Sequence, residues 1–198
     1  MESEAWVSPW WQAACLPSLW DVAGIKVPSL SVWHTFALES IGNSYLCEGG
    51  MPDRDAAASL LLFASRGRDA GRKLVLVERE RERAVRDICR DLRGEWSDID
   101  AACREYVNTC LRAPRRWQKK ETTGKPYHAP YQWHLVRLLS RFMPYQAAWD
   151  FPYAEARCIF DAQAEADGDE SLMSPAQQQK DDEAFAIMQQ REAVACPR

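Results

Sequence analysis

The chain lacks the features that would place a protein in a membrane or in the secretory pathway. No apolar run in it approaches the roughly 20 residues that a helix needs to cross a bilayer. The first six residues, MESEAW, are acidic, whereas a secretory signal begins with positive charge. We therefore expect a cytoplasmic protein that does not act on a membrane.

The motifs of the common catalytic and metal centres are also absent. The chain has no Gly-x-Ser-x-Gly, no phosphate-binding glycine loop and no His-x-x-x-His. Its three histidines, His34, His128 and His134, are scattered, and its seven cysteines include no Cys-x-x-Cys pair. A zinc site would need such pairs at ligand spacing. The sequence predicts no enzyme, no metal and no cofactor, and it suggests that the cysteines are buried thiols in a reducing compartment.

What the chain has in quantity is tryptophan. Nine tryptophans occur, and residues 1–28 contain four of them together with three prolines. Proline at that density discourages a long helix, but large apolar side chains seek a contact. We interpret residues 1–28 as an extended, irregular arm that packs on the body of the protein or on a partner.

Apolar residues recur at helical spacing along most of the remaining chain. Ser29 or Ser31, Asp53 and Ser97 are expected to cap helices, and Ser174 begins a capping-box pattern. Residues 74–77 fit a helix or a strand. The fold class predicted is all-α or nearly so, with six to seven amphipathic helices in an irregular bundle. The expected helices span 29–41, 53–64, 78–93, 97–111, 132–142, 152–167 and 174–188.

Charge is distributed unevenly along the chain. Residues 66–120 carry 16 Lys and Arg against 10 Asp and Glu, whereas residues 146–198 carry 4 against 11. The two regions can attract each other or meet different partners. We divide the chain into an arm, an N-terminal helical subdomain, a basic linker and a C-terminal helical subdomain with an acidic tail, at 1–28, 29–114, 115–130 and 131–198.

The acidic tail has few apolar anchors. Ordering a polar segment costs roughly 1–2 kcal/mol per residue in backbone entropy, which little burial offsets here. We predict that the segment after about Gly168 is peripheral. Its last helix should dock weakly through Phe185, Ile187 and Met188.

The linker combines positive charge with an aromatic ring. Such a combination binds single-stranded nucleic acid by phosphate contact and base stacking, and a solvated linker is the alternative interpretation. Nucleic-acid binding is thus a second functional hypothesis, behind a protein partner. Its candidate residues are Arg115, Arg116, Trp117, Lys119 and Lys120.

Large aromatic residues also gather where the helix over 152–167 is expected to begin. Trp149, Phe151 and Tyr153 lie within five residues of one another, which is more aromatic surface than one helix start needs. We predict that these three residues form a protein-binding surface. The alternative is that they belong to the core.

Two segments resemble a known class of proteins. One is VPSLSVWHTFALESIGN at 27–43, followed by PDRD at 52–55 and an apolar helix. It resembles small helical proteins from the structural gene clusters of tailed bacteriophages, which are commonly taken to be tail assembly chaperones. The other, WDFPY at 149–153, is similar to the Trp/Pro helix start in the C-terminal part of such proteins.

The resemblance implies a helical accessory protein without enzymatic activity. Such a protein keeps a long, aggregation-prone structural partner soluble while a tail assembles, and it acts in the host cytoplasm. A permanent component of the virion is the remaining alternative.

Overall fold

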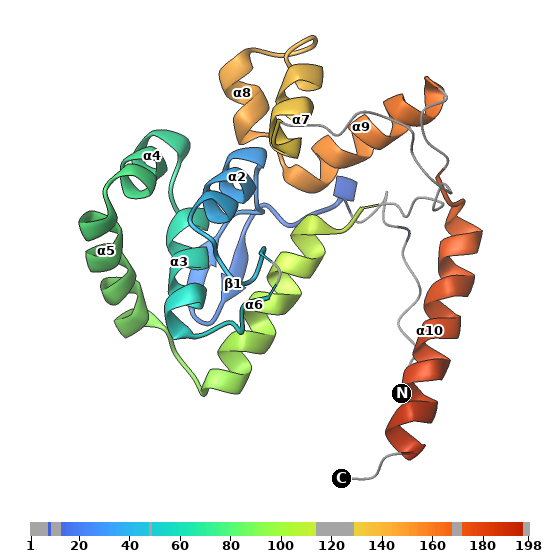
Figure 1. The fold of residues 1–198 in the computed structure, drawn as a ribbon, viewed down its shortest axis with the longest axis horizontal. Helices are drawn as coiled ribbons and strands as arrows, with labels where there is room; N and C mark the ends of the chain where they lie inside the picture. The colour runs from blue at the N-terminus through green and yellow to red at the C-terminus, as the bar shows by residue number, and fades with distance from the viewer. Residues whose placement is uncertain (1–7, 9–12, 48, 114–128, 168–171, 196–198) are drawn as a thin grey trace.

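The computed structural model describes residues 8, 13–47, 49–113, 129–167 and 172–195. The described residues form nine α-helices and one two-stranded antiparallel sheet (Figure 1). The mostly helical fold class is confirmed, with more helices than predicted and a small sheet besides. Within the described residues, no helix has both the length and the apolar character needed to cross a membrane. The elements are β1 Trp20–Val22, β2 Ile25–Val27, α2 Val32–Ser40, α3 Arg54–Ala64, α4 Arg68–Leu76, α5 Glu78–Asp91, α6 Trp96–Leu111, α7 Tyr131–Leu139, α8 Tyr145–Asp150, α9 Tyr153–Ala166 and α10 Pro175–Ala195.

A β-hairpin replaces part of the irregular arm that the sequence predicted. β1 and β2 pair antiparallel around Ala23 and Gly24, whose φ angles are both positive, at 53° and 85°. Turns of that kind match the twist of the strands they join. Val22 and Val27 are buried and fix the hairpin to the body. The prediction of an irregular arm is wrong over 20–27, and residues 1–7 and 9–12 lie outside the described part.

Side-chain caps place the starts of three helices where the sequence predicted them. Ser31 caps α2, and the carboxylate of Asp53 accepts a hydrogen bond from the N–H of Ala56 at 2.8 Å. At α10, the hydroxyl of Ser174 accepts from the N–H of Gln177 at 3.4 Å, and the Gln177 side chain accepts from the N–H of Ser174 at 3.0 Å. Each bond satisfies a donor that helix geometry leaves without an internal partner.

Other predicted boundaries are wrong. α6 begins at Trp96, after Glu95 and without a side-chain cap, so Ser97 is not the cap. Residues 74–76 of the undecided run belong to α4, an additional helix, and Val77 lies between α4 and α5. A further helix, α8, precedes α9. It has only six residues, too few for apolar periodicity to reveal.

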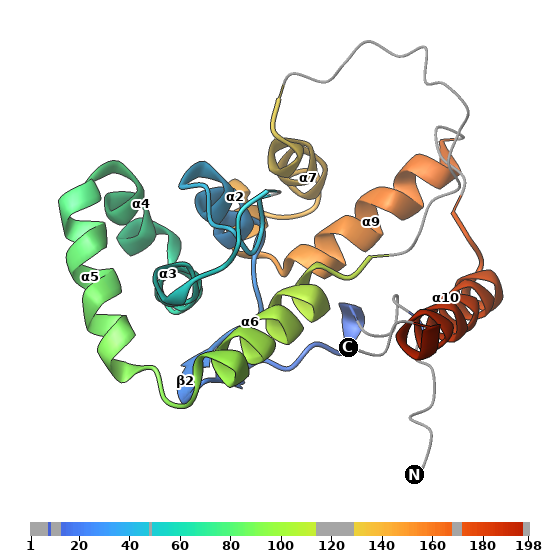
Figure 2. The ribbon, with the colours of Figure 1, turned by 60° about the horizontal axis from the view of Figure 1, so that its bottom comes forward.

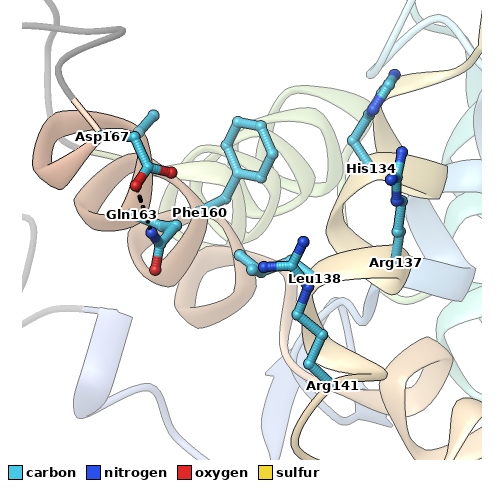
Figure 3. A pocket seen from close by; sticks show the side chains of 8 residues that line it. His134, Arg137, Leu138, Arg141, Phe160, Gln163 and Asp167 are labelled. Atoms are coloured by element: carbon cyan, nitrogen blue, oxygen red, sulfur yellow. Dashed lines mark hydrogen bonds between the residues drawn. The ribbon is translucent and has the colours of Figure 1, made fainter.

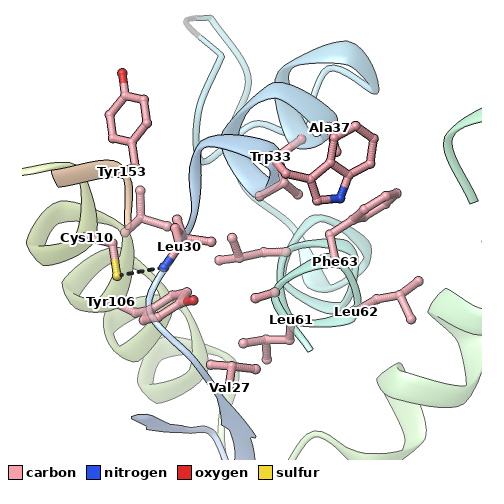
Figure 4. Packing of buried hydrophobic residues seen from close by; sticks show 14 of the residues in the cluster. Val27, Leu30, Trp33, Ala37, Leu61, Leu62, Phe63, Tyr106, Cys110 and Tyr153 are labelled. Atoms are coloured by element: carbon pink, nitrogen blue, oxygen red, sulfur yellow. Dashed lines mark hydrogen bonds between the residues drawn. The ribbon is translucent and has the colours of Figure 1, made fainter. Parts of the chain in front are cut away.

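The hydrophobic core is centred on α3, which α2, α5, α6 and the hairpin surround (Figures 1 and 4). Seven of the eleven residues of α3 are buried. Across from it, the hydroxyl of Tyr106 donates to the carbonyl of Pro28 at 2.6 Å. The thiol of Cys110 accepts from the N–H of Leu30 at 3.5 Å. Cys103 and Cys110, both on α6, are buried, as expected for thiols of the core.

The core joins elements from both sides of the proposed linker. Its buried residues include members of α2, α3 and α6 as well as of α7, α8 and α9. The proposed boundary itself lies at 114–128, outside the described residues. The division into subdomains therefore stays a prediction.

α10 lies apart from the other helices in both views (Figures 1 and 2). Phe185, Ile187 and Met188 are 57%, 50% and 58% exposed, and their weak docking of α10 stays a prediction. One described contact is an ion pair between Arg112 and Asp182 at 3.7 Å. A polar helix buries too little surface at these positions to pack tightly.

Candidate functional site: an aromatic surface on α7 and α8

The two segments that carry the family resemblance meet in space. An isolated antiparallel bridge joins Ser31 to Pro152. The N–H of Val32 donates to the carbonyl of Phe151 at 3.0 Å. In the opposite direction, the N–H of Tyr153 donates to the carbonyl of Leu30 at 2.9 Å. The start of α2 and the start of α9 are thereby held together.

Trp149 is the centre of the aromatic cluster that this contact creates. Its ring lies 6.3 Å from that of Trp33 and 5.6 Å from that of Phe36, both on α2. From the other side, the ring of Trp133 on α7 approaches edge-on at 5.1 Å, and that of Tyr145 on α8 at 6.4 Å. Edge-to-face pairs at such distances contribute about 0.5–1.5 kcal/mol each beyond the area they bury.

The predicted exposure of the 149–153 aromatics is wrong. Trp149 is 4% exposed and Tyr153 is 7% exposed, while Phe151 is half-buried. These side chains pack on the apolar face of α2 and shield it from solvent. Burial also raises the pKa of Tyr153. A direct role of the three residues in partner binding stays a prediction, but in this conformation Trp149 and Tyr153 are core residues.

Three other aromatic side chains are exposed in this region: Trp133 and Tyr145, which contact Trp149, and Phe142, in the turn between α7 and α8. Trp133, Phe142 and Tyr145 are 44%, 76% and 49% exposed, and we call them the aromatic surface. The sequence placed Trp133 and Phe142 on one helix over 132–142, but α7 ends at Leu139 and Phe142 lies beyond it. Which of its apolar residues face solvent depends on where α2 and α8 pack, and periodicity does not contain that information.

The aromatic surface has a rigid base. Ala148 is fully buried and Trp149 nearly so, and both hold α8 against the body. Leu135, Val136 and Leu139 do the same for α7. Aromatic side chains fixed in this way lose little conformational freedom when a partner covers them, which favours tight contact.

His34, which lies in the segment 27–43, has a structural role. It is 7% exposed. Its Nδ1 accepts from the N–H of Ser31 at 3.1 Å, and its Nε2 lies 3.1 Å from the carbonyl of Arg66. Together these contacts fit the neutral tautomer that carries its proton on Nε2. Burial lowers the pKa of His34, which keeps the ring neutral in the folded protein.

The basic residues, the possible metal ligands and the cysteines form no further functional site among the described residues. The basic residues Arg115, Arg116, Trp117, Lys119 and Lys120 lie within 114–128, outside the described residues, so nucleic-acid binding stays a prediction. Among the described residues, no group of three or more His, Cys, Asp or Glu side chains is placed to hold a metal ion. Burial raises the pKa of the Cys103, Cys110 and Cys158 thiols to about 11, which disfavours a reactive thiolate.

The chain matches no protein-family model, no curated protein and no solved structure.

Proposed function

We propose that the protein is a non-enzymatic assembly factor that binds an apolar segment of a long structural protein through the aromatic surface. In this proposal it is a viral protein of the tail-assembly-chaperone kind, acting in the host cytoplasm. It keeps its partner soluble until the partner is incorporated into a tail. The family resemblance of residues 27–43 and 149–153 supports the second part of the proposal.

The observation that carries the proposal is the exposure of Trp133, Phe142 and Tyr145 over a rigid, buried base. Exposed aromatic side chains grouped on one face mark sites of protein contact more often than scattered ones do. Trp133 and Tyr145 also pack on Trp149, yet they remain 44% and 49% exposed, which leaves part of each ring available to a partner.

The test compares proteins retained by affinity-tagged variants of the full chain in producing cells. Phe142→Ala combined with Tyr145→Ala should reduce retention of the partner at least about tenfold, as expected when aromatic anchors are truncated. The matched control, Met51→Ala combined with Leu76→Ala, removes two apolar side chains that are 93% and 79% exposed elsewhere. It should leave retention unchanged.

Trp149→Ala serves as the comparison for stability. It should lower the free energy of unfolding by about 3–5 kcal/mol, as for other large-to-small core substitutions. Phe142→Ala should lower it by less than about 0.5 kcal/mol, as for an exposed site. Equal retention of the partner by the surface variant and its control would refute docking at the aromatic surface.

A separate measurement distinguishes a chaperone from a permanent virion component. Mass spectrometry of purified particles should not detect a chaperone, because it leaves once assembly is complete. Detection of the protein at a fixed copy number in every particle would instead identify a structural component.

A further inference from the structure

A cavity of about 280 Å³ lies between α7 and α9 (Figure 3). Leu138, Phe160 and Ala164 give it an apolar floor. The ring of Phe160 is held edge-on against Tyr131, with the ring centres 5.3 Å apart. A cavity of this size suits a small molecule rather than a protein segment.

The wall formed by α7 is basic. Arg137 lies on α7 and Arg141 in the turn that follows its last residue, Leu139, and both line the cavity beside His134. Among the described residues, neither guanidinium has a carboxylate partner. Each therefore keeps its donors available for an anionic group inside the cavity.

The wall formed by α9 carries the opposite charge. Asp167 lines the cavity there, and its carboxylate accepts a hydrogen bond from the side-chain amide of Gln163 at 2.9 Å. This bond fixes one carboxylate oxygen along α9, while the other retains its capacity to accept. In Figure 3, the arginines and Asp167 lie on opposite sides of Phe160.

Opposite charges thus face each other across an apolar floor without forming an ion pair. Charges of opposite sign attract, but these side chains come from segments on opposite sides of the cavity. A molecule that contacts both walls carries a negative group toward Arg137 and Arg141, a positive group toward Asp167 and an apolar group that packs on the floor. We propose that this cavity binds a small zwitterion of the amino-acid class, with a carboxylate at Arg137 and Arg141 and an ammonium at Asp167.

The test is a calorimetric titration of the full chain with three matched ligands. L-Phenylalanine carries both charges, phenylacetate lacks the ammonium and phenethylamine lacks the carboxylate. L-Phenylalanine should bind at least about tenfold more tightly than either analogue, because each analogue lacks one of the two charged contacts. Equal affinities for the three, or no saturable binding of L-phenylalanine below about 10 mM, would overturn the proposal.

Two variants test which wall of the cavity binds the carboxylate of the ligand and which binds its ammonium. Arg137→Gln combined with Arg141→Gln should weaken L-phenylalanine about tenfold and leave phenethylamine unchanged. Asp167→Asn keeps the hydrogen bond to Gln163 but removes the charge, so it should weaken L-phenylalanine and leave phenylacetate unchanged. Arg83 is exposed on α5, so Arg83→Gln is the control and should leave the affinities of all three ligands unchanged.

Two results with these variants would contradict the proposal. If Asp167→Asn has no effect while the arginine variant does, the cavity binds anions only and the zwitterion proposal is wrong. If the arginine variant weakens all three ligands equally, the loss is structural and the assignment of the carboxylate is wrong. The proposal does not depend on the aromatic surface, since none of the three aromatic residues of that surface lines the cavity.

Discussion

At the scale of single residues, His34 makes the stability of the protein depend on pH. In the folded protein, burial favours the neutral ring of His34 and lowers its pKa below the ordinary value of 6.5. The unfolded chain therefore takes up the proton at a higher pH than the folded protein does. Stability from this residue is fully present above pH 6.5, and it is lost as the pH falls below that value, by at most about 1.4 kcal/mol per pH unit.

The measurement is the free energy of unfolding in urea at about pH 7.5 and about pH 5.5. The unmodified protein should be less stable at the lower pH. His34→Gln should be less stable than the unmodified protein at the higher pH, because an amide does not reproduce both ring contacts. Its further loss on acidification should be smaller, and an equal loss in the two proteins would exclude His34 as the titrating group.

At the scale of elements, the turn between β1 and β2 offers two adjacent substitutions of opposite sign. Gly24→Ala should destabilise the protein by about 1–2 kcal/mol, because its φ is positive and a side chain there is strained. Ala23 already has a positive φ of 53°. Ala23→Asn should stabilise the protein by about 0.5 kcal/mol, because asparagine tolerates that conformation and Asn-Gly suits a type I′ turn. Urea midpoints of the two variants test both signs, and a shift in the same direction would contradict this account of the turn.

The elements also show what a sequence can and cannot reveal about this site. Asp53 and Ser174 were identifiable as caps because a cap acts within four residues of itself. Trp133 and Trp149 look alike in sequence, since each is an aromatic residue in an apolar segment. Their different exposure depends on α2, which is distant in the chain. The candidate site was therefore predictable as an aromatic-rich region, but not as a set of exposed side chains.

At the scale of the whole molecule, α10 should contribute little to stability. One of its described contacts, between Asp182 and Arg112 at the end of α6, is a partly exposed ion pair, and such pairs contribute about 0–1 kcal/mol. A chain ending at Asp167 should therefore unfold cooperatively, with a loss of less than about 1 kcal/mol. Urea denaturation of the two chains measures the difference. Loss of cooperative unfolding in the shortened chain would show that α10 belongs to the folding unit.

The bridge between Ser31 and Pro152 has a consequence for synthesis on the ribosome. Translation delivers α2 long before α8 and α9, at about 5–20 residues per second. Until residues 149–153 emerge, Trp33 and Phe36 on α2 lack the cover that the ring of Trp149 gives them. Completion of the core must wait for the later half of the chain, and a nascent chain paused before α8 presents to its surroundings the apolar face that the finished protein conceals.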